Sequence, residues 1–270
     1  MKSKYKNIVF IVCMLLCSTL CLSLSSTAIK VIADRSDSQI NANQSNTSVS
    51  KYEGKTISFL GDSITTFNGW SNNATMNTTI ADNGYYYTGA KLPVNDTYWK
   101  RVLNALDMTL CVNNSWNGGR VTATNPNIPS GVTRASQLHK DRKNIKPDVI
   151  IVYMGTNDLA NNISLDTFKE SYSEMLDVLK TNYPRAEVYC CTILPESRTE
   201  SKGAERNAYN EAIRYMTKSA GYEVVDFAED IPTWDYSKLT IDDGDMRVHP
   251  NVEGMKLLAD CIIKILTKKA

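Results

Sequence analysis

A serine and a histidine stand out as side chains that could perform chemistry together. Ser63 follows the apolar run Thr56–Leu60, separated from it only by Gly61 and Asp62, so its hydroxyl is expected at the carboxyl end of a buried strand. A serine hydroxyl is a weak nucleophile until a base removes its proton, and histidine suits that task near neutral pH. Taken alone, Ser63 fits a helix N-cap equally well, because serine is favoured there.

The chain has only two histidines that could act as this base. His139 lies in the polar stretch 137–141, which is typical of an exposed helix face, where a histidine is solvated. His249 lies in a predicted loop just before the last amphipathic segment, a position from which catalytic side chains can be aimed. The sequence therefore favours His249 as the base.

Two further polar segments carry groups that could stabilise an oxyanion. One, residues 113–120, follows the second predicted strand, and the other, residues 154–158, follows the third. Backbone N–H groups of a glycine-rich loop and an asparagine amide are the donors that oxyanion holes use. Each segment alone is also an ordinary turn, since Gly and Asn dominate turns. Three such segments after three successive strands favour a catalytic site.

The ordered blocks LGDSIT, NNSWNGGR, GTND and VHPN resemble those of the SGNH hydrolases, also called the GDSL family, over about residues 55–268. The resemblance implies Ser63 as nucleophile and His249 as base. It also implies an oxyanion hole made by the backbone N–H groups of Ser63 and Gly118 and the side-chain amide of Asn157. The implied activity is hydrolysis of carboxylic esters through an acyl-enzyme, with no metal or organic cofactor. The implied fold is a three-layer α/β/α sandwich with a flavodoxin-like, five-stranded parallel sheet.

One block departs from the family pattern. The family usually has an aspartate three residues before the histidine, to orient the imidazole, and here that position is Met246. Asp245 is one residue further away, and we favour it as the third catalytic residue. One alternative is a Ser–His dyad in which a backbone carbonyl orients His249. Another is that Asp245 is a solvated acid in the turn-forming segment 242–245.

The alternation of elements predicts how these residues are positioned. Apolar, β-rich runs are predicted as strands at Thr56–Leu60, Thr109–Asn113, Asp148–Tyr153, Glu187–Leu194 and Glu223–Phe227. Apolar residues recur at helical spacing in residues 99–106, 165–179, 209–216 and 255–266, the second of these after a capping Ser164. Strands that alternate with helices predict a parallel sheet covered on both faces.

Residues 67–98 interrupt this alternation. The segment is rich in Asn, Thr and Tyr, and it follows the first strand, where open parallel sheets have their ligand crevice. Its tyrosines could stack on sugar rings, or the segment could be a packed surface excursion. The first predicted substrate is an O-acetylated or otherwise acylated polysaccharide. The alternatives are a short-chain or lysophospholipid ester and a non-catalytic carbohydrate-binding protein. An α/β-hydrolase is disfavoured, because Thr65 replaces the second glycine of G-x-S-x-G.

The N-terminus predicts export. Residues 1–28 combine three lysines with an uncharged apolar run and a small-residue site ending at Ala28, as in a signal peptide, with an uncleaved membrane anchor as the alternative. Residues 29–52 are predicted as a flexible Ser/Asn-rich linker, and residues 53–270 as the hydrolase domain. The mature protein is expected to be extracellular, without stable membrane insertion.

Charge and cysteine content limit the partners. Removal of residues 1–28 takes away three lysines and leaves 27 basic against 29 acidic residues, a nearly neutral product with no electrostatic reason to bind nucleic acid. Two histidines and the cysteine spacings predict no metal site. The remaining cysteines are expected as buried structural thiols, with one disulfide as the alternative: Cys111, Cys190, Cys191 and Cys261.

Overall fold

The computed structural model describes residues 51–70, 85–86, 92–140, 145–242 and 246–268. The predicted signal peptide, nearly all of the predicted linker and Asp245 lie outside these residues. In the described part of the chain, no helix has both the length and the apolar character needed to cross a bilayer.

Five parallel strands form one sheet in the order β2-β1-β3-β4-β5. Their bounds are β1 Thr56–Gly61, β2 Thr109–Ser115, β3 Val149–Tyr153, β4 Glu187–Cys191 and β5 Glu223–Val225. The central strand β3 is buried along its whole length, as its continuous apolar sequence requires. Gly61 pairs with Ser115 of β2 and with Tyr153 of β3, so the carboxyl ends of these three strands lie level. The loops that follow them therefore meet at one edge of the sheet.

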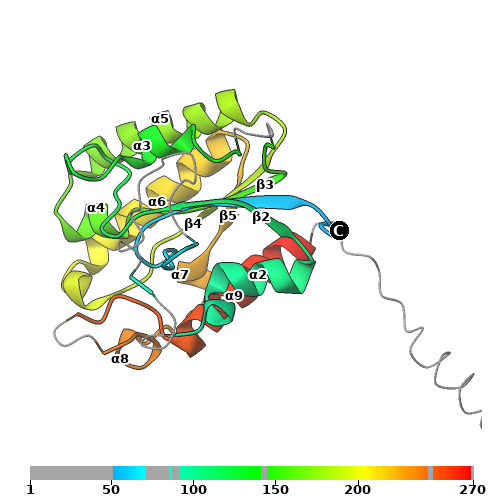
Figure 1. Ribbon diagram of the computed structural model, residues 1–270. Helices are drawn as coiled ribbons and strands as arrows, with labels where there is room; N and C mark the ends of the chain where they lie inside the picture. Colours follow the sequence, from blue (N-terminus) through cyan, green and yellow to red (C-terminus); the bar gives the residue numbers. More distant parts are fainter. Residues whose placement is uncertain (1–50, 71–84, 87–91, 141–144, 243–245, 269–270) are drawn as a thin grey trace, which may run out of the picture. The chain divides into compact units, whose positions relative to one another are not determined.

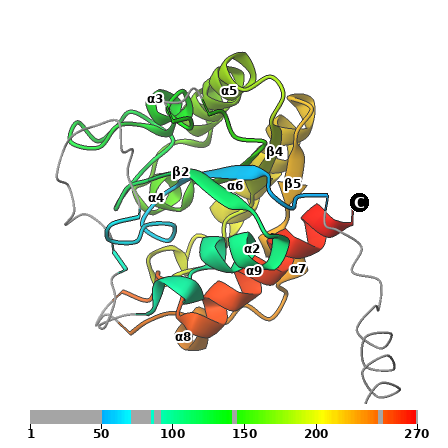
Figure 2. The same ribbon diagram turned by 45° about the vertical axis from the view of Figure 1, so that its right-hand side comes forward.

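Helices cover both faces of the sheet (Figures 1 and 2), and the predicted three-layer α/β/α sandwich is confirmed. Helices α2 (Tyr98–Leu106) and α9 (Val252–Thr267) pack together on one face. Helices α3 (Gly131–Ala135), α5 (Leu165–Asn182) and α6 (Gly203–Ser219) lie on the other. The short elements are η1 Val94–Asp96, α4 Thr156–Ala160, η3 Ser197–Thr199, α7 Phe227–Asp230 and α8 Tyr236–Leu239.

Local chemistry accounts for the helix boundaries. Ser164 caps α5 as predicted, and its hydroxyl accepts a hydrogen bond from the Thr167 amide. Asn251 caps α9 in the same way. The prediction that β4 extends to Leu194 is wrong, because its pairing with β5 ends at Cys191 and residues 192–194 are buried in a loop. The short helices α3 and α4 were not predicted, because their few residues show no clear apolar period.

The core extends slightly beyond the predicted domain boundary. Tyr52, the last residue of the predicted linker, is buried, and its hydroxyl forms hydrogen bonds with Tyr189 and Glu187. All four cysteines of the described residues are buried free thiols. Burial raises the pKa of Cys190 to about 11, so this thiol stays protonated and acts as a packing group.

Candidate active site

Ser63 lies in the tight turn that follows β1. The Thr65 amide donates to the Asp62 carbonyl at 3.1 Å, and the Thr66 hydroxyl donates to the carbonyl of Ser63 itself at 2.7 Å. A Cβ atom at Gly61 would overlap the Thr65 side chain, so only glycine allows the turn to fold back this closely. Steric crowding therefore explains why glycine stands two residues before Ser63.

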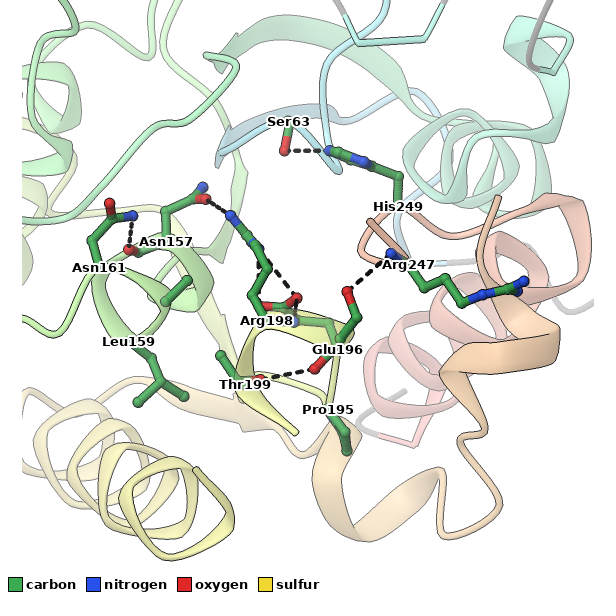
Figure 3. A network of polar contacts seen from close by, with 12 residues as sticks. Ser63, Asn157, Leu159, Asn161, Pro195, Glu196, Arg198, Thr199, Arg247 and His249 are labelled. Atoms are coloured by element: carbon green, nitrogen blue, oxygen red, sulfur yellow. Dashed lines mark hydrogen bonds and ion pairs between the residues drawn. The ribbon is translucent and has the colours of Figure 1, made fainter. Parts of the chain in front are cut away.

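His249 lies in the loop just before α9, as the sequence predicted. The next residue, Pro250, forms an isolated bridge with Thr240, and Asn251 is the N-cap of α9. Its Nε2 is 2.8 Å from the Oγ of Ser63 (Figure 3). Both side chains are nearly buried, with Ser63 4% and His249 6% exposed. A base within hydrogen-bond reach of a serine hydroxyl is the arrangement that activates a nucleophile.

Two tyrosines of the predicted loop 67–98 form a wall of the site. The ring of Tyr85 stacks on the imidazole of His249, with 3.3 Å between centroids and 15° between planes. Tyr86 meets the same imidazole edge-on and donates its hydroxyl hydrogen to the Pro250 carbonyl at 2.8 Å. Tyr86 is fully buried and packs against the histidine loop, so it is not available for a sugar ring.

His139 is remote from this site. The prediction that it is solvated on an exposed helix face was wrong. It lies beyond the end of α3, is half-buried, and its Nδ1 is 2.9 Å from the hydroxyl of Tyr183. That hydroxyl also accepts from the Leu138 amide. His139 is therefore part of a local network around Tyr183, which the polar sequence around it did not indicate.

Asn157 lies in the first turn of α4, and its side chain joins three loops. Its Nδ2 donates to the Gly119 carbonyl at 3.0 Å and is 3.4 Å from the Asp62 carboxyl group. Gly118, in the loop after β2, has a φ of +70°, a conformation that favours glycine. The structure thus places the Gly118 loop, Asn157 and the serine turn at the same edge of the sheet.

Asp62 is a buried carboxyl group beside the predicted nucleophile. Desolvation raises its pKa to about 7, although the Ile64 amide hydrogen bond and the positive charge of Arg198 act in the opposite direction. The carboxyl group therefore changes charge near neutral pH, within reach of the Asn157 amide.

Two buried charged residues that the sequence analysis did not single out hold the loops in place. The carboxylate of Asp158 accepts from the backbone amides of Val121 and Thr122. The guanidinium of Arg134 donates to the carbonyls of Gly61 and Asn114 at 2.9 and 2.8 Å, linking the ends of β1 and β2. Burial lowers the pKa of Arg134 to about 10, so the group remains a cation at neutral pH. Asp158 was visible in the GTND block, whereas nothing in the sequence around Arg134 indicated this role.

Asp245, the predicted third catalytic residue, lies outside the described residues. Met246, at the usual position of the family's aspartate, is 45% exposed. Within the described ranges, no three His, Cys, Asp or Glu side chains are arranged to hold a metal ion.

Comparisons with known proteins show the family and the fold of the chain. The model of the GDSL-like lipase/acylhydrolase family matches residues 59–257. A multidomain esterase from Ruminococcus flavefaciens is 32% identical over 129 residues, which cover 46% of this chain and only 16% of that protein.

Two solved structures share the fold. One, described as a GDSL-like lipase from Bacteroides ovatus, is 23% identical with a TM-score of 0.59 and covers 81% of this chain and 100% of its own. The other is a carbohydrate esterase family 2 enzyme with a carbohydrate-binding domain from Corynascus thermopiles, 18% identical with a TM-score of 0.57, covering 79% of this chain and 66% of its own.

Proposed function

Because the chain belongs to the GDSL-like lipase/acylhydrolase family, we propose that it is a serine esterase in which Ser63 is the nucleophile and His249 the base. The 2.8 Å contact between Ser63 Oγ and His249 Nε2 is the observation that carries this proposal. Burial of both groups excludes most of the water that would otherwise compete for the hydroxyl proton.

The reaction proceeds in two steps. His249 accepts the Ser63 proton as the hydroxyl oxygen attacks the ester carbonyl, and the resulting imidazolium then protonates the leaving alcohol. In the second step His249 takes a proton from water, which attacks the acyl-enzyme. The bond to the Ser63 oxygen then breaks, His249 returns the proton to that oxygen, and the acid is released. The stacked ring of Tyr85 supports the imidazolium in both steps, because a cation over an aromatic face is attracted by the ring quadrupole.

The oxyanion is held by the backbone N–H groups of Ser63 and Gly118 and by the amide of Asn157. The long 3.4 Å contact between Asn157 Nδ2 and Asp62 is the weakest of the amide's hydrogen bonds, so this N–H is the one that turns to the substrate. A protonated Asp62 favours this exchange, because an ionised carboxylate would repel the developing negative charge.

Hydrolysis of p-nitrophenyl acetate tests the proposal. We expect Ser63→Ala and His249→Ala to lose at least about a thousandfold in kcat, as removal of a nucleophile or its base requires. His139→Ala is the matched control, since it removes the other histidine of the chain, and should retain the wild-type rate. Equal rates for wild type and Ser63→Ala would refute the serine mechanism. If both rates equal that of the uncatalysed reaction, the alternative of a non-catalytic carbohydrate-binding protein is favoured.

For the substrate, we propose an O-acetylated or otherwise acylated polysaccharide outside the cell. Support comes from the export signal predicted in residues 1–28 and from the carbohydrate esterase among the proteins of similar fold. The rival substrates are a lysophospholipid and a short-chain lipid ester. Release of acetate from acetylated xylan or acetylated peptidoglycan should be faster than release of fatty acid from lipid esters. A strong preference for p-nitrophenyl esters of eight or more carbons would overturn the carbohydrate assignment.

We further propose that signal cleavage near Ala28 releases the protein from the cell. Immunodetection in the culture medium with an N-terminus at about residue 29 is expected. Retention of full-length protein in the membrane fraction would favour the uncleaved anchor instead.

A further inference from the structure

An ion pair in the loop after β4 contacts the predicted oxyanion hole. The carboxylate of Glu196 is 3% exposed and accepts from Nε of Arg198 at 3.1 Å. The same carboxylate accepts from the Arg198 backbone amide at 2.8 Å. The first bond holds the Arg198 side chain and the second its backbone, and the guanidinium is turned toward Asn157 (Figure 3).

The guanidinium reaches the oxygen of the Asn157 side chain. Nη1 of Arg198 donates to Asn157 Oδ1 at 3.3 Å, and on the other side the Gly119 carbonyl accepts from Asn157 Nδ2 at 3.0 Å. Arginine can only donate and a carbonyl can only accept. A flipped Asn157 amide would therefore face a donor with its NH₂ group and an acceptor with its oxygen, and both contacts would be repulsive.

Resting on the proposed function, we infer that Arg198, held by Glu196, is a positioning residue that fixes the Asn157 amide with its N–H groups toward the oxyanion. The positively charged guanidinium of Arg198 also polarises the Asn157 amide through its oxygen, which strengthens the N–H groups as donors. This arrangement acts on Asn157 and requires no contact between Arg198 and the substrate.

The arginine loop is tied to the histidine loop as well. The Ser197 amide donates to the Arg247 carbonyl at 3.3 Å, and the Arg247 amide donates to the Ser197 hydroxyl at 3.0 Å. Arg247 is two residues from His249, and its own guanidinium is bound elsewhere, by Asp242. These two hydrogen bonds hold the backbone of the arginine loop beside the backbone that precedes His249. The Arg198 side chain remains directed at the oxyanion donor Asn157.

A double-mutant cycle on p-nitrophenyl acetate hydrolysis tests the inference. Loss of a charge-assisted hydrogen bond predicts that Arg198→Met lowers kcat about tenfold, with KM changed less than about twofold. In the Asn157→Ala background, the same substitution should have almost no further effect, because the group that it orients is absent. Glu196→Gln keeps one acceptor for the arginine and should give an intermediate loss.

Arg101→Met is the matched control. Arg101 also pairs with a nearby acid, Asp96, and has a similar exposure, 28% against 32% for Arg198, but it lies on α2 away from Asn157. It should keep the wild-type kcat. Thermal unfolding of each variant separates a folding defect from a catalytic one. Arg198→Lys provides a second variant, which retains the positive charge but lacks the planar guanidinium.

Three outcomes overturn the inference. They are an unchanged kcat in folded Arg198→Met, a full tenfold loss that persists in the Asn157→Ala background, and a change confined to KM. Failure of the esterase proposal itself is recognised separately, because Ser63→Ala would then hydrolyse the ester as fast as wild type.

Discussion

The buried carboxyl group of Asp62 should make the stability of the fold depend on pH in an unusual direction. Its pKa is about 7 in the folded protein, against 3.8 in an unfolded chain. Below pH 3.8 both states carry the proton, and the fold is not penalised. Between these two values the unfolded chain is ionised while the folded protein still holds its proton, so stability falls as the pH rises.

The magnitude follows from the difference between the two pKa values. Each unit corresponds to about 1.4 kcal/mol, so a shift of about three units predicts a loss of about 4 kcal/mol between pH 4 and pH 7. Asp62→Asn keeps the shape of the side chain and does not titrate. The quantity to follow is the difference in unfolding free energy, wild type minus variant. It should fall by about 4 kcal/mol between pH 4 and pH 7 and remain constant above about pH 8.

Urea unfolding at half-unit pH steps from about 3 to about 9 measures this difference directly, because every other group titrates alike in both proteins. Asp226→Asn provides a control of opposite sign. The ion pair with Arg214 helps hold the pKa of Asp226 below its usual range although burial acts against it, so wild type should gain stability over that variant as the pH rises from 3 to 5. A wild-type minus Asp62→Asn difference that stays constant, or that rises with pH, would refute the buried, raised-pKa carboxyl group.

The remaining predictions concern single side chains. Asn157→Ala should lower kcat about a hundredfold or more, since one oxyanion donor contributes about 3 kcal/mol, and a loss under about threefold in ester hydrolysis would contradict its role. Arg134→Met should lower the free energy of unfolding by about 3 kcal/mol or more in urea titrations, because it orphans buried carbonyls including that of Gly61. An unchanged midpoint would exclude this structural role. Gly254→Ala should also destabilise: helix propensity favours alanine by about 1 kcal/mol, but its Cβ would overlap the Leu239 carbonyl, and overpacking costs about 1–3 kcal/mol. A raised melting temperature would contradict the steric argument.

The fold was predictable because its signals are local. Each strand of the sheet is an apolar run, and the four long helices show helical spacing and, at Ser164, a capping side chain. Ser63 could be singled out as a candidate because it follows the end of a strand, and His249 because it lies in the loop before α9. The need for glycine at position 61 became clear only from the structure, in which a Cβ atom there would overlap the Thr65 side chain.

The supporting residues of the site could not be predicted, because their partners are distant in sequence. Arg134 binds a carbonyl 73 residues away, and Arg198 binds an amide 41 residues away. No local pattern marks such contacts. The same reason explains the wrong prediction for His139, whose surroundings look polar in the sequence but include the hydroxyl of Tyr183 from the end of α5. The stacking of Tyr85 on His249 joins residues far apart in the sequence, so the Tyr-rich segment alone did not indicate it.

Covalent labelling of the nucleophile tests the central claim most directly. The protein would be incubated with a fluorophosphonate ester, digested, and analysed by mass spectrometry to locate the adduct. The proposed mechanism predicts a single adduct on Ser63, formed at least about a hundredfold more slowly in His249→Ala, because the proton of the attacking hydroxyl then has no base. An adduct on another residue, or labelling of Ser63 at the same rate without His249, would contradict the account.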